Sequence, residues 1–353
     1  MLKRAAALLL IGASAVTWTS CAGTKSHYVF VALQSQSQIE VYREDPNSGI
    51  LTVTVNSPYT VGSGVRALVV HPSRKFLYAA NSGESDISLF KISSTGGLTE
   101  VTPRTTSGTI PVFMALDPGG KFLYVANQGS NNISVFSVDS STGALAEVSN
   151  SPFPIGVSPA SMILSPSGNT LYVGSSAQFG GSVIGFSTNG GTLHSFGSFN
   201  TGVAPVALAI DPAGKFLYTA NSIDSTISEF TIDAATGGLT PIGGGVVSDS
   251  SFQHPTALLI DPAGKYVFEA NTTPSTLAVY TIGTDGGLSI SANPGFAASH
   301  NPEVMTIDPT GRYIYVGNQA GGLQAFAFTA STGQLFAFTS YSPGNTTSIV
   351  VIP

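Results

Sequence analysis

One segment recurs six times along the chain, and this repetition constrains the fold more than any other feature of the sequence. Each copy has an apolar run, a turn built on Pro, and a second apolar run ending in Asn or Ser, as in ALDPGGKFLYVAN at 115–127. Successive copies lie about 46 to 50 residues apart, which is the length of one four-stranded propeller blade. The prolines that mark the copies are Pro72, Pro118, Pro166, Pro212, Pro262 and Pro309.

Each repeat predicts four short strands. The Asp-Pro-x-Gly turn joins the first two, because Pro sets φ, Gly accepts positive φ and the Asp side chain caps the turn. A run such as 133–136 predicts the third strand, and a Thr-Gly-x-Leu hairpin such as 142–145 joins it to the fourth. Counting related hairpins at 45–51, 93–98, 187–193, 233–239, 284–288 and 329–335, seven hairpins accompany the six Asp-Pro-type turns.

The missing seventh turn predicts how the ring closes. Residues 346–353 have the character of a first strand and end at the Pro position of the turn, whereas residues 27–32 have the character of a second strand. One blade is therefore expected to take its first strand from the C-terminus and three strands from the N-terminus, which removes an open sheet edge. The predicted fold is all-β, a seven-bladed β-propeller with four-stranded blades.

Composition excludes several classes of function. Charged residues are only 9% of the chain, the net charge is −6, and Lys and Arg cluster nowhere beyond Lys3-Arg4 and Arg74-Lys75. Nucleic-acid binding requires concentrated cations, so it is excluded. The sequence has no metal-ligand motif, no Gly-rich nucleotide loop and no Gly-x-Ser-x-Gly elbow. We therefore expect neither a metal nor a cofactor.

The N-terminus has the pattern of an export signal. Lys3 and Arg4 precede an apolar stretch over 5–17 that is too short to span a membrane, and small residues precede Cys21. Residues 18–23 resemble a bacterial lipobox, with Trp18 in place of the usual Leu. The expected organisation is a signal peptide over 1–20, a lipid on Cys21, a short tether over 21–27 and one propeller domain over 28–353. Cleavage after Ala13-Ser14-Ala15 is the alternative, and it would give a soluble secreted protein with a free Cys21 thiol.

The Tyr-Val-Ala-Asn segments, the Asp-Pro-x-Gly-Lys turns and the Thr-Gly-x-Leu hairpins together resemble the lactonase-type propellers. That family includes 6-phosphogluconolactonase-like proteins and YVTN-repeat surface proteins. The resemblance covers nearly all of residues 28–353. It implies the fold more strongly than an activity, because the shared motifs are turns and core strands.

Chain direction predicts which residues approach the central channel. They directly follow the position that opens each first strand: Arg66, Val112, Ala160, Val206, Thr256 and Glu303. One cation and one carboxylate stand out in this small or apolar set. His254 and His300 lie just before two of the openings and are candidate catalytic and ligand-binding residues respectively.

The resemblance also indicates where catalysis would occur. Catalytic lactonase-like propellers often carry Gly-Pro-Arg-His at the start of a first strand, whereas this chain has Gly64-Val65-Arg66-Ala67, which keeps the Arg and replaces the His. Opening a lactone needs a base and an oxyanion-stabilising group. Arg66 is the candidate cation, with Glu303 or His254 as the base. The structural alternative is an Arg66–Glu303 ion pair or plain solvation of both groups.

Two further sets of polar residues are candidates. Five asparagines end the second strands on the channel side, where they either cap the blade or contact a sugar: Asn81, Asn127, Asn221, Asn271 and Asn318. Glu269 and Glu229 stand where sister repeats have smaller or apolar residues. An outer or rim position with solvent access is the favoured interpretation of both carboxylates, and a functional site is the alternative.

Two functions follow as hypotheses. The first is an exported, lipid-anchored propeller that binds a sugar-derived or envelope-protein ligand in its channel, in the periplasm or at the cell surface. Ala22 after the cysteine is consistent with outer-membrane sorting in a Gram-negative cell. The second is a lactone hydrolase acting on a sugar-derived or other small lactone. A monomer is expected, with membrane contact only through the lipid on Cys21.

Overall fold

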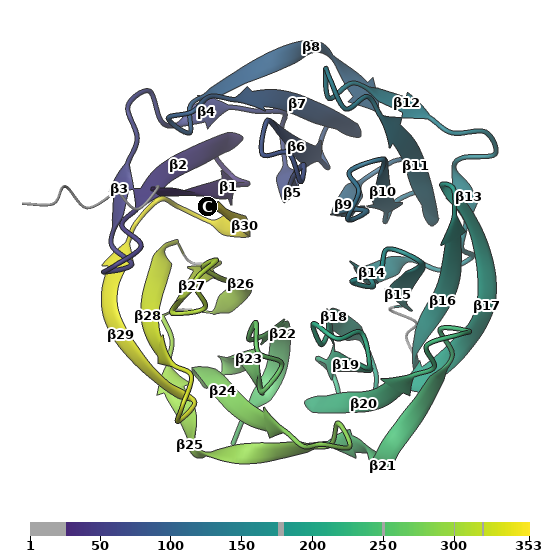
Figure 1. Ribbon diagram of the computed structural model, residues 1–353, viewed down its shortest axis with the longest axis vertical. Helices are drawn as coiled ribbons and strands as arrows, with labels where there is room; N and C mark the ends of the chain where they lie inside the picture. Colours follow the sequence, from purple (N-terminus) through teal and green to yellow (C-terminus); the bar gives the residue numbers. More distant parts are fainter. Residues whose placement is uncertain (1–25, 176–179, 249–250, 300, 320) are drawn as a thin grey trace, which may run out of the picture.

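Short strands are the only regular elements of the computed structural model, which describes residues 26–175, 180–248, 251–299, 301–319 and 321–353. They form seven separate antiparallel sheets arranged around a central axis (Figure 1). Within the described residues, no helix has the length and apolar character needed to cross a membrane. The predicted seven-bladed all-β propeller is confirmed. Cys21 and the predicted signal peptide lie outside the described residues.

Each blade runs from an inner strand beside the axis to an outer strand at the periphery. Blades 1 to 7 are numbered from the N-terminus. Their inner strands are, in that order, β30 (Thr346–Ile352), β5 (Val65–Val70), β9 (Pro111–Leu116), β14 (Pro159–Leu164), β18 (Pro205–Ile210), β22 (Gln253–Ile260) and β26 (Pro302–Ile307). Their second strands are β1 (His27–Leu33), β6 (Phe76–Asn81), β10 (Phe122–Asn127), β15 (Thr170–Ser175), β19 (Phe216–Asn221), β23 (Tyr266–Thr273) and β27 (Tyr313–Asn318).

The third strands are β2 (Gln38–Glu44), β7 (Asp86–Ile92), β11 (Asn132–Val138), β16 (Gly181–Asn189), β20 (Thr226–Ile232), β24 (Ser275–Ile282) and β28 (Leu323–Thr329). Five outer strands are continuous: β8 (Leu98–Thr106), β17 (Thr192–Thr201), β21 (Leu239–Val247), β25 (Leu288–Ala297) and β29 (Gln334–Tyr341). In blades 1 and 3 the outer strand is broken into two pieces. These are β3 (Leu51–Val53) with β4 (Tyr59–Thr60), and β12 (Leu145–Glu147) with β13 (Phe153–Pro154).

The ring closes through the two ends of the chain. β1 pairs antiparallel with β30, from Tyr28 opposite Ile352 to Leu33 opposite Thr346. This is the shared blade that the missing seventh turn predicts. The tether was expected to include His27, but His27 opens β1 and its imidazole bonds the buried carboxylate of Glu44 at 3.1 Å.

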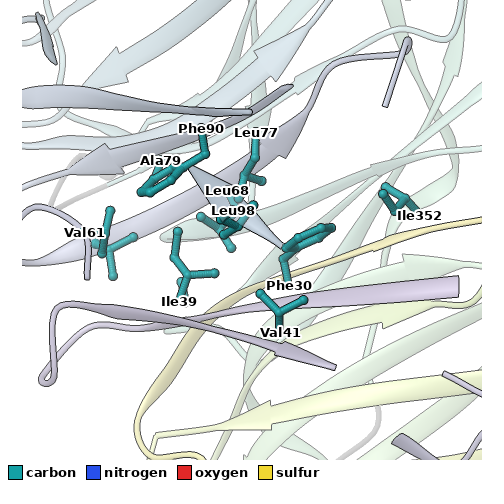
Figure 2. Close-up of a cluster of buried hydrophobic side chains, with 12 residues drawn as sticks. Phe30, Ile39, Val41, Val61, Leu68, Leu77, Ala79, Phe90, Leu98 and Ile352 are labelled. Atoms are coloured by element: carbon teal, nitrogen blue, oxygen red, sulfur yellow. The ribbon is translucent and has the colours of Figure 1, made fainter. Parts of the chain in front are cut away.

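Apolar side chains fill the space between neighbouring blades. Figure 2 shows the cluster between blades 1 and 2, where Phe30 and Val41 of blade 1 lie close to Leu77 and Phe90 of blade 2. Ile352 of the C-terminal strand belongs to the same cluster. Strands packed on both faces need no alternation of apolar and polar residues, which explains why strands such as β10 are buried along most of their length.

The Thr-Gly-x-Leu hairpins join each blade to the one before it. Gly143 of blade 3 has a φ of +77°, and a methyl group there would lie 2.7 Å from the ring of Phe76 in blade 2. Only glycine combines this conformation with so close an approach. The same contact recurs in five other pairs: Gly49 with Tyr313, Gly96 with Tyr28, Gly191 with Phe122, Gly286 with Phe216, and Gly333 with Tyr266.

A buried tyrosine hydroxyl bonds the hairpin glycine of the next blade at four junctions, three of which have the glycine–ring contact. Tyr218 donates a hydrogen bond of 2.7 Å to the carbonyl of Gly286 in the next blade. The equivalent bonds run from Tyr78 to Gly143, from Tyr172 to Gly237 and from Tyr315 to Gly49. The last of these spans blades 7 and 1, so the same contact also serves the closing junction.

Replacing Tyr218 by Phe is expected to lower the free energy of unfolding by about 1–3 kcal/mol, because the Gly286 carbonyl then stays buried without its donor. Urea unfolding followed by far-UV circular dichroism measures the change. Tyr28→Phe is the matched control, since its hydroxyl makes only an exposed contact of 3.4 Å. Equal losses in the two variants would show that the buried bond contributes nothing of its own.

Candidate functional site: the bulge ring of the central channel

Every inner strand carries a β-bulge at the same position. In β5, for example, Val65 pairs with Asn81 and Ala67 with Ala80, so Arg66 is the extra residue. Bulges redirect a side chain away from the regular ladder and are common beside functional sites. The extra residues of the seven blades form what we call the bulge ring: Arg66, Val112, Ala160, Val206, Thr256, Glu303 and Thr347.

The local sequence explains the bulge. Pro opens most of the inner strands, and the residue before it takes a positive φ, as Ile110, Ala204 and Asn301 do at 51° to 60°. The chain therefore enters the blade sharply and places one extra residue before the regular ladder begins. Six of the seven members were predicted from the opening position. Thr347, on the C-terminal strand, was not among the predicted residues.

All seven members of the bulge ring line a central channel with a cavity volume of about 540 Å³. The other lining residues are mostly small or apolar, such as Ala207 and Val304. Gln128 and Ser222 add polar groups, and both directly follow the asparagine that ends a second strand. Gln128 and Ser222 could have been found from the sequence by this position next to the asparagine. Arg66 and Glu303 are the only charged residues among those that line the channel.

Hydroxyl groups around the channel hold neighbouring blades together. Thr256 donates to the carbonyl of Pro302 at 2.6 Å, and Thr347 donates to that of Val65 at 2.9 Å. Ser161 makes the equivalent bond, at 2.7 Å, to Pro205. These hydroxyls are engaged in the framework. Arg66 and Glu303 are therefore the groups of the bulge ring that are available for chemistry.

Glu303 lies on β26, and Arg66 lies on β5, on the other side of β30. They form no ion pair within 4.0 Å in the described part of the chain, so the direct pair that the sequence offers as an alternative is absent. The Oε2 atom of Glu303 is buried and has no hydrogen-bond partner among the described residues. Burial raises the pKa of the Glu303 carboxyl above its ordinary value, and the positive charge of Arg66 partly offsets this.

The remaining candidates of the predicted site lie elsewhere. The side chain of His254 is exposed and is not among the residues that line the channel; its backbone N–H donates to Ser225. His300 is outside the described residues. Ala67, at the position of the family's His, is buried and paired with Ala80. Glu303 is therefore the candidate base that the structure brings into the channel with Arg66.

The five predicted asparagines are buried and are not among the channel-lining residues. The Nδ2 atom of Asn81 donates to Asp86 at 2.7 Å and to Ser88 at 3.0 Å, which ties the second strand to the third. Asn127 and Asn221 make the same pair of bonds in their own blades. Such hydrogen bonds are what a blade-capping role requires. They hold the amide groups inside the blades.

Glu229 and Glu269 are not at a solvated rim, contrary to the favoured interpretation, because both are at least 96% buried between blades 5 and 6. Protein donors compensate for this burial. Glu229 accepts the backbone N–H of Leu288 at 2.7 Å. Glu269 accepts bonds from Asn271 and Tyr280. Burial raises the pKa of the Glu229 carboxyl. Neither residue lines the channel.

One buried cluster has the residue types of a metal site. A ligand atom each from His27, Glu44 and Asp308 lies within 4.8 Å of the other two. However, the oxygens of Asp308 already accept bonds from the backbone of Thr310, Arg312 and Tyr313. Glu44 likewise accepts a bond from Tyr315. We therefore interpret the cluster as part of the junction between blades 7 and 1.

Comparison with protein families matches the description "Lactonase, 7-bladed beta-propeller" over residues 57–158, 151–253 and 244–352. These matches cover most of the chain. The chain belongs to this family. A comparison with curated proteins finds no match.

Solved structures of low identity share the lactonase propeller fold. A proposed 6-phosphogluconolactonase from Bacteroides uniformis is 17% identical, with a TM-score of 0.82, over 93% of this chain and 100% of that chain. A periplasmic gluconolactonase from Pseudomonas aeruginosa is 20% identical, with a TM-score of 0.78, over 93% and 99%. A protein from Lactobacillus plantarum is 19% identical, with a TM-score of 0.81, over 93% and 100%.

Removing Arg66 is expected to raise the pKa of Glu303 further, because the cation that favours the charged carboxylate is lost. Carboxyl ¹³C NMR titration of the wild type and of Arg66→Gln measures the change, and Glu303→Gln identifies the signal. Arg74→Gln is the control, because it removes an exposed cation that does not line the channel. An Arg66→Gln titration that overlays the wild type would mean that the two groups do not interact.

Proposed function

We propose that this member of the lactonase propeller family hydrolyses a small lactone in its central channel. The observation that carries the proposal is the pair of unneutralised charges in the bulge ring. Glu303 has a buried oxygen without a partner, and Arg66 forms no hydrogen bond or ion pair among the described residues. The names of the similar solved proteins, which include a gluconolactonase, support the same reaction class.

The two groups have complementary roles in the proposed reaction. The Glu303 carboxylate takes a proton from water as the water oxygen bonds to the lactone carbonyl carbon. The Arg66 guanidinium stabilises the negative charge that develops on the carbonyl oxygen. When the ring C–O bond breaks, the leaving alkoxide takes the proton back from the Glu303 carboxyl. The product is the open hydroxy acid, and the enzyme returns to its starting protonation state.

The charge of the channel favours an uncharged lactone. Phosphate recognition generally uses several cationic or hydrogen-bonding groups, whereas Arg66 is the only cation that lines this channel, and Glu303 would repel a phosphate. The small and apolar remainder of the bulge ring suits the ring carbons of such a substrate. A sugar-derived lactone without a phosphate group is therefore the expected substrate class.

Replacing Glu303 by Gln is expected to lower kcat about 10²- to 10⁴-fold, and replacing Arg66 by Ala about 10²- to 10³-fold. A weakly buffered pH-indicator assay on gluconolactone, its 6-phosphate and simple γ-lactones measures this, with spontaneous opening subtracted. Glu147→Gln, on the exposed outer strand of blade 3, is the matched control. Because the charged carboxylate is the base, kcat/KM is expected to fall as the pH drops through the raised pKa of Glu303. Undiminished turnover in Glu303→Gln would exclude this mechanism.

Ala67 favours a second candidate, a propeller that binds a sugar-derived or envelope-protein ligand without turnover. It stands where the family's pattern has His, and no described side chain orients the free oxygen of Glu303 as an activated base would require. No hydrolysis of any lactone in the panel, together with capture of a ligand that Arg66→Ala fails to capture, would favour this candidate.

We also propose that the protein is exported and anchored by a lipid on Cys21, on the strength of the basic, apolar and small-residue pattern over residues 3–21. Metabolic labelling with a radioactive fatty acid in a bacterial host tests it. The wild type is expected to carry label and to sediment with membranes, and Cys21→Ser is expected to lose both properties. Release of unlabelled wild-type protein into the soluble fraction would instead indicate cleavage near Ala15.

A further inference from the structure

A second cavity lies between the outer parts of blades 1 and 2, and none of its lining residues lines the channel. Its outer walls are formed near β3, β4 and β8, which lie at the periphery of the ring (Figure 1). Its volume is about 630 Å³. We call it the blade 1–2 groove. Its walls are the β1–β2–β3 face and the turn after β3 on one side, and the β7–β8 hairpin on the other. Arg43 is the only charged residue among those that line it.

The broken outer strand of blade 1 forms part of the wall of this groove. β3 has three residues and β4 has two, and the chain between them forms a turn. Hydrogen bonds tie this segment to β2. Thr54 donates its backbone N–H to the carbonyl of Val41, and the Ser57 hydroxyl oxygen accepts the backbone N–H of Val41.

Blade 3 has the same broken strand and serves as an internal comparison. Tyr28 pairs with Arg43 in blade 1, and Phe122 pairs with Ser137 at the same register in blade 3. Tyr59 of β4 likewise corresponds to Phe153 of β13, each opposite the equivalent Ile. Blade 1 therefore carries a guanidinium and two phenol hydroxyls where the equivalent blade has a serine and two phenyl rings.

The Arg43 guanidinium and the two tyrosine hydroxyls form few contacts that stabilise the fold. Among the described residues, the Arg43 guanidinium forms no hydrogen bond and no ion pair within 4.0 Å, and the Tyr59 hydroxyl forms no hydrogen bond. Tyr28 makes one exposed contact of 3.4 Å. Thr52, directly opposite Arg43, adds an exposed hydroxyl. The blade 1–2 groove therefore places the guanidinium of Arg43 and several hydroxyls beside apolar surface from Val53 and the tyrosine rings, and this combination suits a small polar ligand.

We propose that the blade 1–2 groove binds a saccharide carrying a carboxylate, that is, a uronate. The guanidinium of Arg43 matches a carboxylate with two parallel hydrogen bonds. The tyrosine rings, with exposed Val53 beside them, offer an apolar surface to the C–H face of a sugar ring. The hydroxyls of Thr52 and Tyr59 are available to the sugar hydroxyls. This site is independent of the proposed reaction in the channel.

Isothermal titration calorimetry of the purified protein with trigalacturonate, and with the neutral trisaccharide maltotriose, tests the proposal. Trigalacturonate is expected to bind with a stoichiometry of one, and maltotriose at least ten-fold more weakly. Arg43→Gln is expected to weaken trigalacturonate binding at least ten-fold, and Arg43→Lys to weaken it as well, because lysine keeps the charge without the planar fork. Tyr59→Phe is expected to weaken it a few-fold.

Two control variants make the test specific. Lys215→Gln removes a cation from a turn of blade 5 and should leave trigalacturonate binding unchanged, as should Arg66→Ala in the channel. Equal affinity for the two trisaccharides, unchanged binding in Arg43→Gln, or no binding of trigalacturonate at millimolar concentration would each overturn the proposal. Loss of binding in Arg66→Ala but not in Arg43→Gln would also overturn it, by moving the saccharide to the channel.

Discussion

The rest of the structure depends on one repeated contact between neighbouring blades. In this contact, the hairpin glycine of one blade packs against the aromatic ring at the start of the second strand of the preceding blade. It needs a residue with positive φ and no side chain, as at Gly143 against Phe76. The neighbouring tyrosine adds a hydrogen bond to the same glycine in three of these junctions. Because the contact recurs at six of the seven junctions, it joins most blades to their neighbours in the same way.

The channel follows from the ring that the blades form. Once the ring is closed, the seven bulges face one axis, and residues far apart in sequence become neighbours. Arg66 and Glu303 belong to blades 2 and 7, yet the shared blade 1 alone separates them. The Thr347 hydroxyl bonds blade 2 across this gap. The closing blade thus joins the two ends of the chain and lies between the two charged residues of the channel.

Departures from the repeat indicate function better than the repeat itself. The repeated residues serve the packing of the blades, as the buried asparagines show. They are therefore weak candidates for a ligand-binding site. Arg66 and Glu303 break the small or apolar pattern of the bulge ring, and Arg43 and Tyr59 break the likeness between blades 1 and 3. Glu229 and Glu269 also break the pattern, but protein donors satisfy them between two blades. The role of a residue that departs from the repeat can therefore be assigned only from its burial and its hydrogen-bond partners.

The sequence by itself determined the number of blades, the shared closing blade and six of the seven residues of the bulge ring, because turns, hairpins and strand direction are local properties repeated along the chain. It did not determine that Glu229 and Glu269 are buried, that His254 faces solvent, or that the groove beside Arg43 exists. These depend on how one blade packs against the next, which involves residues separated by at least a whole repeat. The tertiary structure decided them, since burial and charge separation across an axis arise only when the ring is closed.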